Sequence, residues 1–165
     1  MIVVLMGVSG CGKTTIGKEL AERLSARFVE GDAFHSPANI EKMTNGTPLT
    51  ELDREPWLQS IRNEIEVAIQ SCESLVVACS ALTRKSRELL GLEEAQIQVV
   101  YLDAPKNVIA NRLANRDDHF MPQELLDSQF DTLQAPTQHE AIHVDATLPM
   151  RRVIELILKR IPIPG

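Results

Sequence analysis

The stretch "IVVLMGVSGCGKT", Ile2–Thr14, decides the fold of this protein. Its first part, Ile2–Met6, is an apolar run rich in β-branched residues, which is typical of a buried parallel strand. Its second part, Gly7–Thr14, matches the pattern G-x-x-x-x-G-K-[ST] at every fixed position. Apolar residues then recur at helical spacing from Ile16 to Leu24. A strand, a glycine-rich loop and a helix in this order predict a P-loop that binds a nucleoside triphosphate.

The residue types in this loop suit phosphate binding. Glycines permit a tight loop whose backbone N–H groups point at phosphate oxygens, and the helix N-terminus adds a favourable field for an anion. We expect Lys13 to reach the β- and γ-phosphates and the Thr14 hydroxyl to bind Mg²⁺. A chance match is the alternative, and the flanking strand and helix argue against it. The expected nucleotide-binding residues are Gly7, Val8, Ser9, Gly10, Cys11, Gly12, Lys13, Thr14 and Thr15.

Composition narrows the class of protein. The chain has 165 residues, of which 44% are hydrophobic and 24% charged, as in ordinary soluble proteins, so we expect one compact domain over residues 1–165. The net charge of -6 argues against a nucleic-acid partner. The apolar start is too short to span a membrane, and no basic region precedes it as in a signal peptide.

The three cysteines, Cys11, Cys72 and Cys79, have no metal-ligand spacing, which favours a reducing, cytoplasmic location. Within the loop, Cys11 is either a small filler or a thiol whose pKa is lowered by Lys13.

Apolar runs alternate with helical patterns along the rest of the chain. The helix that starts after Thr50 has a predicted N-cap there, with Asp53 at the capping-box position and Trp57 on its core face. This alternation predicts an α/β fold with a mostly parallel five-stranded sheet, flanked by helices. The strands are expected at residues 2–6, 27–31, 75–80, 97–103 and 141–145.

A second basic cluster occurs in "RLANRDDHFM", where Arg112 and Arg116 are four residues apart and would share a helix face. Two guanidinium groups there could stabilise a transferring phosphoryl group from a lid, expected at approximately residues 112–134. The alternative is a solvated surface on which Asp117 and Asp118 pair with the arginines. Arg112 and the loop at residues 146–149 are also expected to border the base of the nucleotide.

The segment "GDAFHSPANIEKM", Gly31–Met43, follows the second expected strand and is rich in polar groups. The middle strand has Ser80 where many NTPases carry a Walker-B acid, so Asp32 is the available acid near the metal. This arrangement is typical of small phosphoryl-transfer kinases. Asp32 is therefore a candidate general base, and N-capping the next helix is its alternative role.

Several runs resemble the gluconokinase family. They are "MGVSGCGKTTIG", "EGDAFHSPANIEKMTNGTPLTELDREPWL", "ACSALTRKSRELL", "RLANRDDHFMPQELLDSQFDTLQAP" and the closing "HVDA". The resemblance implies a P-loop kinase fold like that of nucleoside-monophosphate and shikimate kinases. It also implies ATP and Mg²⁺ as cofactors and phosphorylation of D-gluconate at its 6-hydroxyl, and it suggests a homodimer.

The resemblance also favours particular site residues. It implies Lys13, Asp32 and Arg116 as catalytic groups. Expected substrate contacts, besides Asp32, are His35, Arg54, Ser80, His119 and Gln129.

The residues themselves leave alternative roles open for several of these side chains. His35 could be a local cap or surface group, and Ser80 could cap the following helix. Arg54, whose fork suits a carboxylate, could pair with Asp53 or Glu51. Asn39 and Lys42 either contact the substrate or fix their own segment.

Two rival functions remain. One is another small-molecule kinase of the same architecture, such as a shikimate or nucleoside-monophosphate kinase, although "GDAFH" lacks the second acid of the D-x-D found in shikimate kinases. The other is a non-catalytic nucleotide-binding module, against which the set of Lys13, Thr14, Asp32 and the arginine pair argues.

Overall fold

The computed structural model describes residues 1–115 and 123–162. Five strands form one sheet in the order β2-β3-β1-β4-β5, and every neighbouring pair is parallel. This confirms the predicted five-stranded sheet, which is wholly parallel. The strands are β1 (Ile2–Met6), β2 (Arg27–Glu30), β3 (Leu75–Ala78), β4 (Ile97–Asp103) and β5 (Ile142–Asp145).

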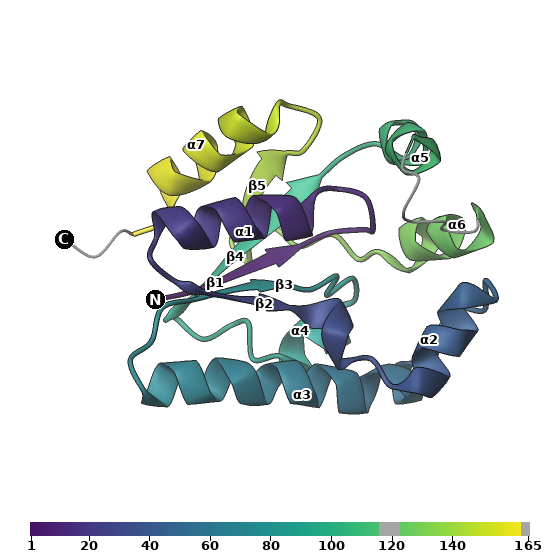
Figure 1. Ribbon diagram of the computed structural model, residues 1–165, viewed down its shortest axis with the longest axis horizontal. Helices are drawn as coiled ribbons and strands as arrows, with labels where there is room; N and C mark the ends of the chain where they lie inside the picture. The colour runs from purple at the N-terminus through teal and green to yellow at the C-terminus, as the bar shows by residue number, and fades with distance from the viewer. Residues whose placement is uncertain (116–122, 163–165) are drawn as a thin grey trace.

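Helices cover both faces of the sheet (Figure 1). On one face lie α1 (Lys13–Arg23) and α7 (Met150–Arg160), and on the other lie α3 (Glu51–Gln70) and α4 (Arg84–Leu89). Alternate residues of β1 enter opposite cores, with Val3 and Leu5 on the α1 side and Val4 on the α3 side. All five residues of β1 are buried, which explains why this strand is a continuous apolar run.

The long helix α3 begins as the sequence predicts. The Thr50 side chain accepts from the Asp53 N–H, and the Asp53 side chain accepts from the Thr50 N–H, so the capping box is complete. Trp57 and Ile61 are buried against the sheet. The capping box and this apolar face together hold the first turn of α3 at the edge of the site described below.

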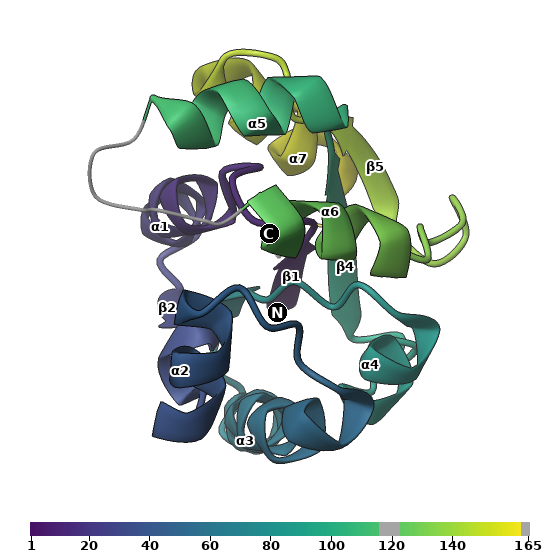
Figure 2. The ribbon, with the colours of Figure 1, turned by 90° about the vertical axis from the view of Figure 1, so that its right-hand side faces the viewer.

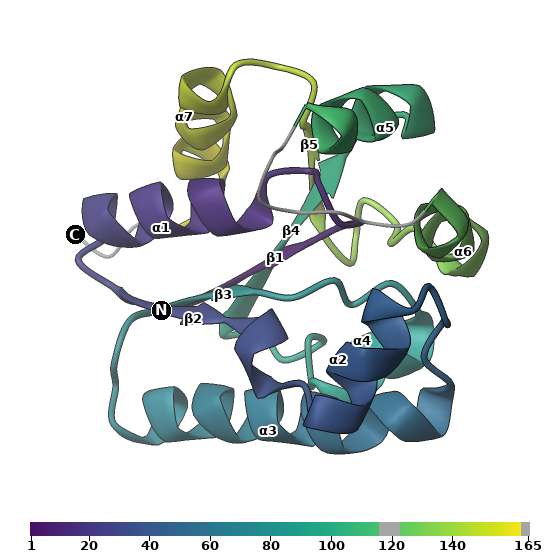
Figure 3. The same cartoon turned by 45° about the vertical axis from the view of Figure 1, so that its right-hand side comes forward.

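Four shorter helices stand at the end of the sheet where the strands finish. The 3-10 helix η1 (Gly31–Phe34) and α2 (Pro37–Thr44) follow β2, while α5 (Lys106–Ala114) follows β4 and leads toward α6 (Gln123–Thr132). Figures 2 and 3 show α2 and α6 at this end of the molecule. Ligands of open parallel sheets bind at the carboxyl ends of the strands, where neighbouring connections diverge to opposite faces. The loop after β1, which lies between β3 and β4, occupies that position.

Among residues 1–115 and 123–162, none of the helices combines the length and the apolar character that a membrane crossing requires.

Candidate active site

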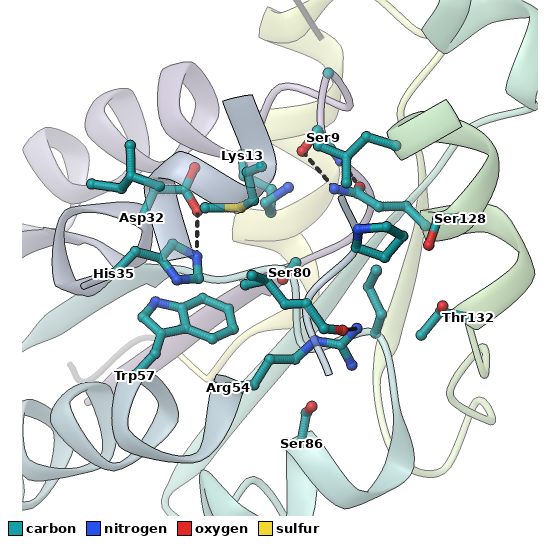
Figure 4. A pocket seen from close by; sticks show the side chains of 18 of the residues that line it. Ser9, Lys13, Asp32, His35, Arg54, Trp57, Ser80, Ser86, Ser128 and Thr132 are labelled. Carbon is teal, nitrogen blue, oxygen red and sulfur yellow. Dashed lines mark hydrogen bonds and ion pairs between the residues drawn. The ribbon is translucent and has the colours of Figure 1, made fainter. Parts of the chain in front are cut away.

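A cavity of about 420 Å³ opens at the carboxyl ends of the strands (Figure 4). The P-loop forms one part of its wall, and residues from β2 to α3 form another. Its polar lining residues are Ser9, Lys13, Thr14, Thr15, Asp32, His35, Thr44, Arg54, Ser80, Ser86, Ser128, Gln129 and Thr132. The structure therefore brings most of the described site candidates into a single cavity.

The P-loop has the backbone shape that its glycines permit. Gly12, at the N-cap of α1, has a φ of 98°, which lies in the left-handed region that favours glycine. A Cβ at Gly7 would lie 2.8 Å from the carbonyl oxygen of Leu102, too close for any side chain. The loop thus packs tightly against β4, and its helix end opens toward the cavity.

Lys13 is folded over this loop. Its ammonium donates to the carbonyl oxygens of Gly7 at 2.8 Å and Val8 at 2.9 Å. The same ammonium lies 3.9 Å from the Sγ of Cys11, a side chain that is buried in the core beneath the loop. The burial of Cys11 supports its interpretation as a small packing residue.

Glu30 is a site residue that sequence reasoning missed. The Thr14 hydroxyl donates a short hydrogen bond to the carboxylate of Glu30, the last residue of β2. Asp32, the acid expected near the metal, lies two residues further on, in η1, and lines the same cavity as Thr14. The signal was the "EGD" run, which places two carboxylates at the end of one strand.

The Thr14 hydroxyl and the Glu30 carboxylate are both oxygen donors, which suit a hard divalent cation. Within the described ranges 1–115 and 123–162, no group of three or more His, Cys, Asp and Glu side chains could hold a metal ion by itself. A cation here would therefore take its remaining ligands from phosphate oxygens and water, as Mg²⁺ does in other P-loop proteins.

Asp32 does not cap the helix that follows it, which was its alternative role. Glu30 accepts from the Asp32 N–H and so caps η1, while Ser36 caps α2. The Asp32 side chain is 73% exposed, and its carboxylate faces the imidazole of His35 across 3.9 Å. Its carboxylate is therefore free to meet a ligand in the cavity (Figure 4).

His35 is held against an aromatic wall. Its ring stacks on Trp57 with centroids 4.1 Å apart and an interplanar angle of 18°, and its side chain is only 5% exposed. The interpretation as a surface group is therefore wrong. Burial lowers the pKa of His35, against the opposing effect of Asp32 and with a contribution from the positive Arg54. The imidazole is thus neutral at pH 7, and its Nδ1 has no hydrogen-bond partner among the described residues.

Arg54 projects from the first turns of α3 into the cavity (Figure 4). One of its nitrogens donates to the Leu49 carbonyl at 2.9 Å, which leaves other N–H groups for a ligand. The residues considered as its partners are engaged elsewhere: Asp53 pairs with Lys42, and Glu51 pairs with Lys85. The guanidinium is thus available for a carboxylate.

Asn39 and Lys42 fix their own segment. The Asn39 amide donates to the Asp53 carbonyl at 2.8 Å, and the Lys42 ammonium binds both carboxylate oxygens of Asp53 at 3.0 and 2.9 Å. Neither residue lines the cavity among the residues described. Their neighbours Ile40 and Met43 do line it.

Ser80 lies two residues beyond the end of β3, and its side chain lines the cavity. Its carbonyl accepts from the Gly7 N–H at 3.2 Å, which joins the end of β3 to the P-loop. The alternative role as a helix cap is wrong, because Thr83 caps α4. β3 itself ends at Ala78, two residues earlier than expected.

The described part of the expected lid contacts the nucleotide side. The Gln129 side chain accepts from the Ser9 N–H at 2.7 Å and donates to the Ser9 hydroxyl at 3.1 Å, so α6 is attached to the P-loop. Arg112 donates to the Ala146 carbonyl at 2.5 Å, which brings together the residues expected to border the base. The helix α5 ends at Ala114, and Arg116 and His119 lie outside the described residues.

Comparisons with known proteins agree on one family. A family model described as an AAA domain (AAA_33) matches residues 2–138. A gluconokinase of Gluconobacter oxydans is 45% identical over 140 residues, covering 85% of this chain and 79% of that protein. The crystal structure of a gluconokinase from Sinorhizobium meliloti has a TM-score of 0.84 and 40% identity, covering 96% of this chain and 89% of that one.

A more distant likeness supports the fold alone. The shikimate kinase of Aquifex aeolicus has a TM-score of 0.69 at 18% identity, covering 96% of this chain and 95% of that one. The predicted P-loop kinase fold, like that of shikimate kinases, is thereby confirmed.

Proposed function

Because the chain belongs to the gluconokinase family of P-loop kinases, we propose that it transfers the γ-phosphoryl group of ATP to the 6-hydroxyl of D-gluconate. The product is 6-phospho-D-gluconate. One observation carries the proposal: a single cavity joins a P-loop to a polar wall that offers a carboxylate, an imidazole and a guanidinium. Such a wall suits a polyhydroxy acid, whose carboxylate and hydroxyls need a cation and several hydrogen-bonding groups.

The nucleotide side uses the P-loop, Gly7 to Thr15. Its N–H groups and the start of α1 bind the phosphates. The Lys13 ammonium, which is held by two loop carbonyls in this structure, transfers its hydrogen bonds to phosphate oxygens when ATP binds. Arg112 and the loop that follows β5 border the base.

The cation site consists of Thr14 and Glu30. Their oxygens fit Mg²⁺, with phosphate oxygens and water as the remaining ligands. When bound, Mg²⁺ neutralises charge on the phosphates. Glu30 also accepts from the Asp32 N–H, so one side chain links the cation site to the residue that faces the acceptor.

The acceptor side uses Asp32, His35 and Arg54, together with Ser80. The Asp32 carboxylate orients the 6-hydroxyl and takes its proton as the hydroxyl oxygen attacks the γ-phosphorus, while the bond from that phosphorus to the bridging oxygen breaks and ADP leaves. His35, neutral and stacked on Trp57, hydrogen-bonds a hydroxyl of the substrate. The Arg54 guanidinium binds the substrate carboxylate.

Residues 112–134 act as a lid that closes over the transferring group. Gln129 connects its described return helix to Ser9, and Arg116 and His119 belong to its other part. Arg116 stabilises charge on the transferring phosphoryl group, and His119 contacts the substrate. We further propose that residues 1–165 act as one domain, that the enzyme is a homodimer and that it works in the cytoplasm.

A coupled assay of the purified protein across sugar acids, shikimate and nucleoside monophosphates tests the proposal. We expect Mg²⁺- and ATP-dependent turnover with D-gluconate. Turnover with shikimate or a nucleoside monophosphate and none with gluconate would overturn the assignment.

A further inference from the structure

The helix α2 forms a wall of the cavity but lies away from the sheet (Figure 3). Ile40, Met43 and Thr44 of this helix line the cavity, and so do Pro48 and Leu49 in the connection that follows. The position of α2 therefore sets the width of the acceptor side. Its attachment to the rest of the protein decides whether that wall is in place before a substrate arrives.

Side chains of α2 attach to α3 at one residue. Within the described ranges, the side-chain hydrogen bonds that join α2 to α3 all end on Asp53, two of them from Lys42 and one from Asn39. Asp53 also receives the Thr50 N–H in the capping box at the start of α3. A single aspartate thus joins the cavity wall to the capped start of the long helix α3, whose apolar face packs on the sheet.

The next residue makes this attachment relevant to the substrate. Arg54 follows Asp53 on α3, and its guanidinium lines the cavity while donating to the Leu49 carbonyl. Two neighbouring residues of α3 thus fix this region: Asp53 binds side chains of α2, and Arg54 binds the carbonyl of Leu49 in the connection between the two helices. A movement of α2 would change the surroundings of the guanidinium that is proposed to bind the substrate carboxylate.

The charge state of Asp53 is constant under ordinary assay conditions. The Thr50 backbone N–H, followed by the Lys42 ammonium, lowers the pKa of Asp53 to about 2. Lys42 therefore faces a full negative charge throughout the neutral range.

We propose that Lys42, Asn39 and Asp53 form a positioning clamp that holds α2 in the substrate-binding position and so sets the affinity for the acceptor, without touching it. The inference rests on the proposed gluconate kinase activity. The clamp preorganises the acceptor side, because an anchored α2 loses less conformational freedom when the substrate binds.

The first experiment compares two lysine variants. Lys42→Met removes the ion pair of the clamp, and we expect a rise of about fivefold in the KM for gluconate, the size expected for a partly exposed ion pair, with the KM for ATP unchanged. Lys85→Met is the matched control, because Lys85 also pairs with carboxylates of α3, Glu51 and Glu55, from α4 rather than α2. Lys42→Arg keeps the cation and should restore the wild-type KM. Equal KM values for gluconate in Lys42→Met and Lys85→Met would overturn the proposal.

A double-mutant cycle separates a clamp from a direct substrate contact. Asp53→Asn removes the carboxylate charge that Lys42 binds, while its amide oxygen can still accept from Thr50. If Lys42 acts through Asp53, the KM of the double variant Lys42→Met/Asp53→Asn matches that of Asp53→Asn alone. If the rise in the KM for gluconate in the double variant equals the product of the rises in the two single variants, Lys42 contacts gluconate itself. That result also overturns the proposal.

A third measurement needs no acceptor and so separates this inference from the assigned activity. Hydrogen exchange of the amides of Ile40–Thr44 should be faster in Lys42→Met than in the wild type, and unchanged in Lys85→Met. If the wild-type enzyme fails to phosphorylate gluconate, the proposed function is wrong while this exchange result still decides the clamp. Unchanged exchange in Lys42→Met contradicts the clamp, whatever the acceptor.

Discussion

Two carboxylates lie two residues apart at the end of β2, and their surroundings give them different roles. Glu30 accepts from the Thr14 hydroxyl and from the Asp32 N–H, so it belongs to the nucleotide side. Asp32 is mostly exposed in the cavity and faces His35. At the scale of the residue, the proposed cation ligand Glu30 and the proposed acid–base group Asp32 are separated by one glycine, Gly31.

Replacing Asp32 with Asn removes the carboxylate that we propose as the general base. We expect kcat to fall by about 100-fold or more, while ATP binding is retained, because general-base catalysis typically contributes that much. Steady-state kinetics and nucleotide titration measure the two effects. Asp131→Asn, an exposed site on α6 outside the cavity lining, is the control, and near-normal kcat in Asp32→Asn would leave Asp32 without a catalytic role.

Replacing Glu30 with Gln should weaken the response to Mg²⁺. We expect the free Mg²⁺ concentration for half-maximal activity to rise about tenfold, the scale on which residues around a metal alter its affinity. Titration of Mg²⁺ at saturating ATP and gluconate measures the shift. Glu41→Gln, on the exposed side of α2, should leave the titration unchanged, and a similar curve for both variants would remove Glu30 from the cation site.

His35 makes stability depend on pH. Since burial lowers its pKa, the folded protein binds fewer protons here than the unfolded chain does. The stabilisation is fully present above the ordinary histidine pKa of about 6.5 and is lost as the pH falls below that value toward the folded pKa. Urea unfolding between pH 8 and acid pH should show this loss in the wild type and in His139→Gln, which alters an exposed histidine, but less of it in His35→Gln. An identical pH dependence in all three proteins would contradict this account.

At the scale of the element, helices that stand beyond the sheet are attached to the site by few side chains. α6 is bound to the P-loop through Gln129 and Ser9. The backbone of Gln134, just after α6, donates to the Leu82 carbonyl, and its side chain accepts from the Arg84 N–H. The helix α6 and the residues just after it are therefore attached both to the P-loop and to the start of α4.

Replacing Gln129 with Leu should lower kcat and raise the KM for ATP, each by about fivefold, because two hydrogen bonds of about 1 kcal/mol each are lost between α6 and the P-loop. Gln123→Leu is the matched control, since Gln123 bonds only to Asp127 within α6 among the contacts of the described residues. An effect confined to the KM for gluconate would instead place Gln129 on the substrate.

At the scale of the whole molecule, the sheet and its two cores hold the loops of the site in place. β1 is central, and its residues are inaccessible on both faces. The P-loop extends directly from this strand, so the position of the phosphates depends on the best-buried part of the protein.

Replacing Leu5 with Ala should lower the free energy of unfolding by about 2–5 kcal/mol, because the side chain is wholly buried and a cavity would remain. Leu52→Ala, at a side chain that is 76% exposed, should change it by less than about 0.5 kcal/mol. Urea unfolding of both variants tests the contrast. Equal losses would contradict the assignment of Leu5 to the core.

Much of this architecture could be predicted from the sequence, because five apolar runs of strand length alternate with helical patterns. The order of the strands could not be read, since it depends on long-range pairing that leaves no local pattern. Glu30 was missed because its contact with Thr14, 16 residues away, exists only once α1 and β2 have come together in the fold. The structural role of Asn39 and Lys42 was left open for a similar reason, since it depends on their distance from Asp53 in the fold.

Most of the proposed acceptor side comes from one continuous stretch of chain, residues 31–57, which includes the cavity-lining residues Asp32, His35, Arg54 and Trp57. The nucleotide side comes mainly from a separate stretch around the P-loop. An exchange of residues 31–57 with the corresponding piece of a related kinase would therefore alter acceptor preference as a unit. Such a chimaera would keep the P-loop and the order of the strands, since neither lies within the exchanged segment. Residues 31–57 are therefore the part of the chain to vary in the design of kinases for other sugar acids.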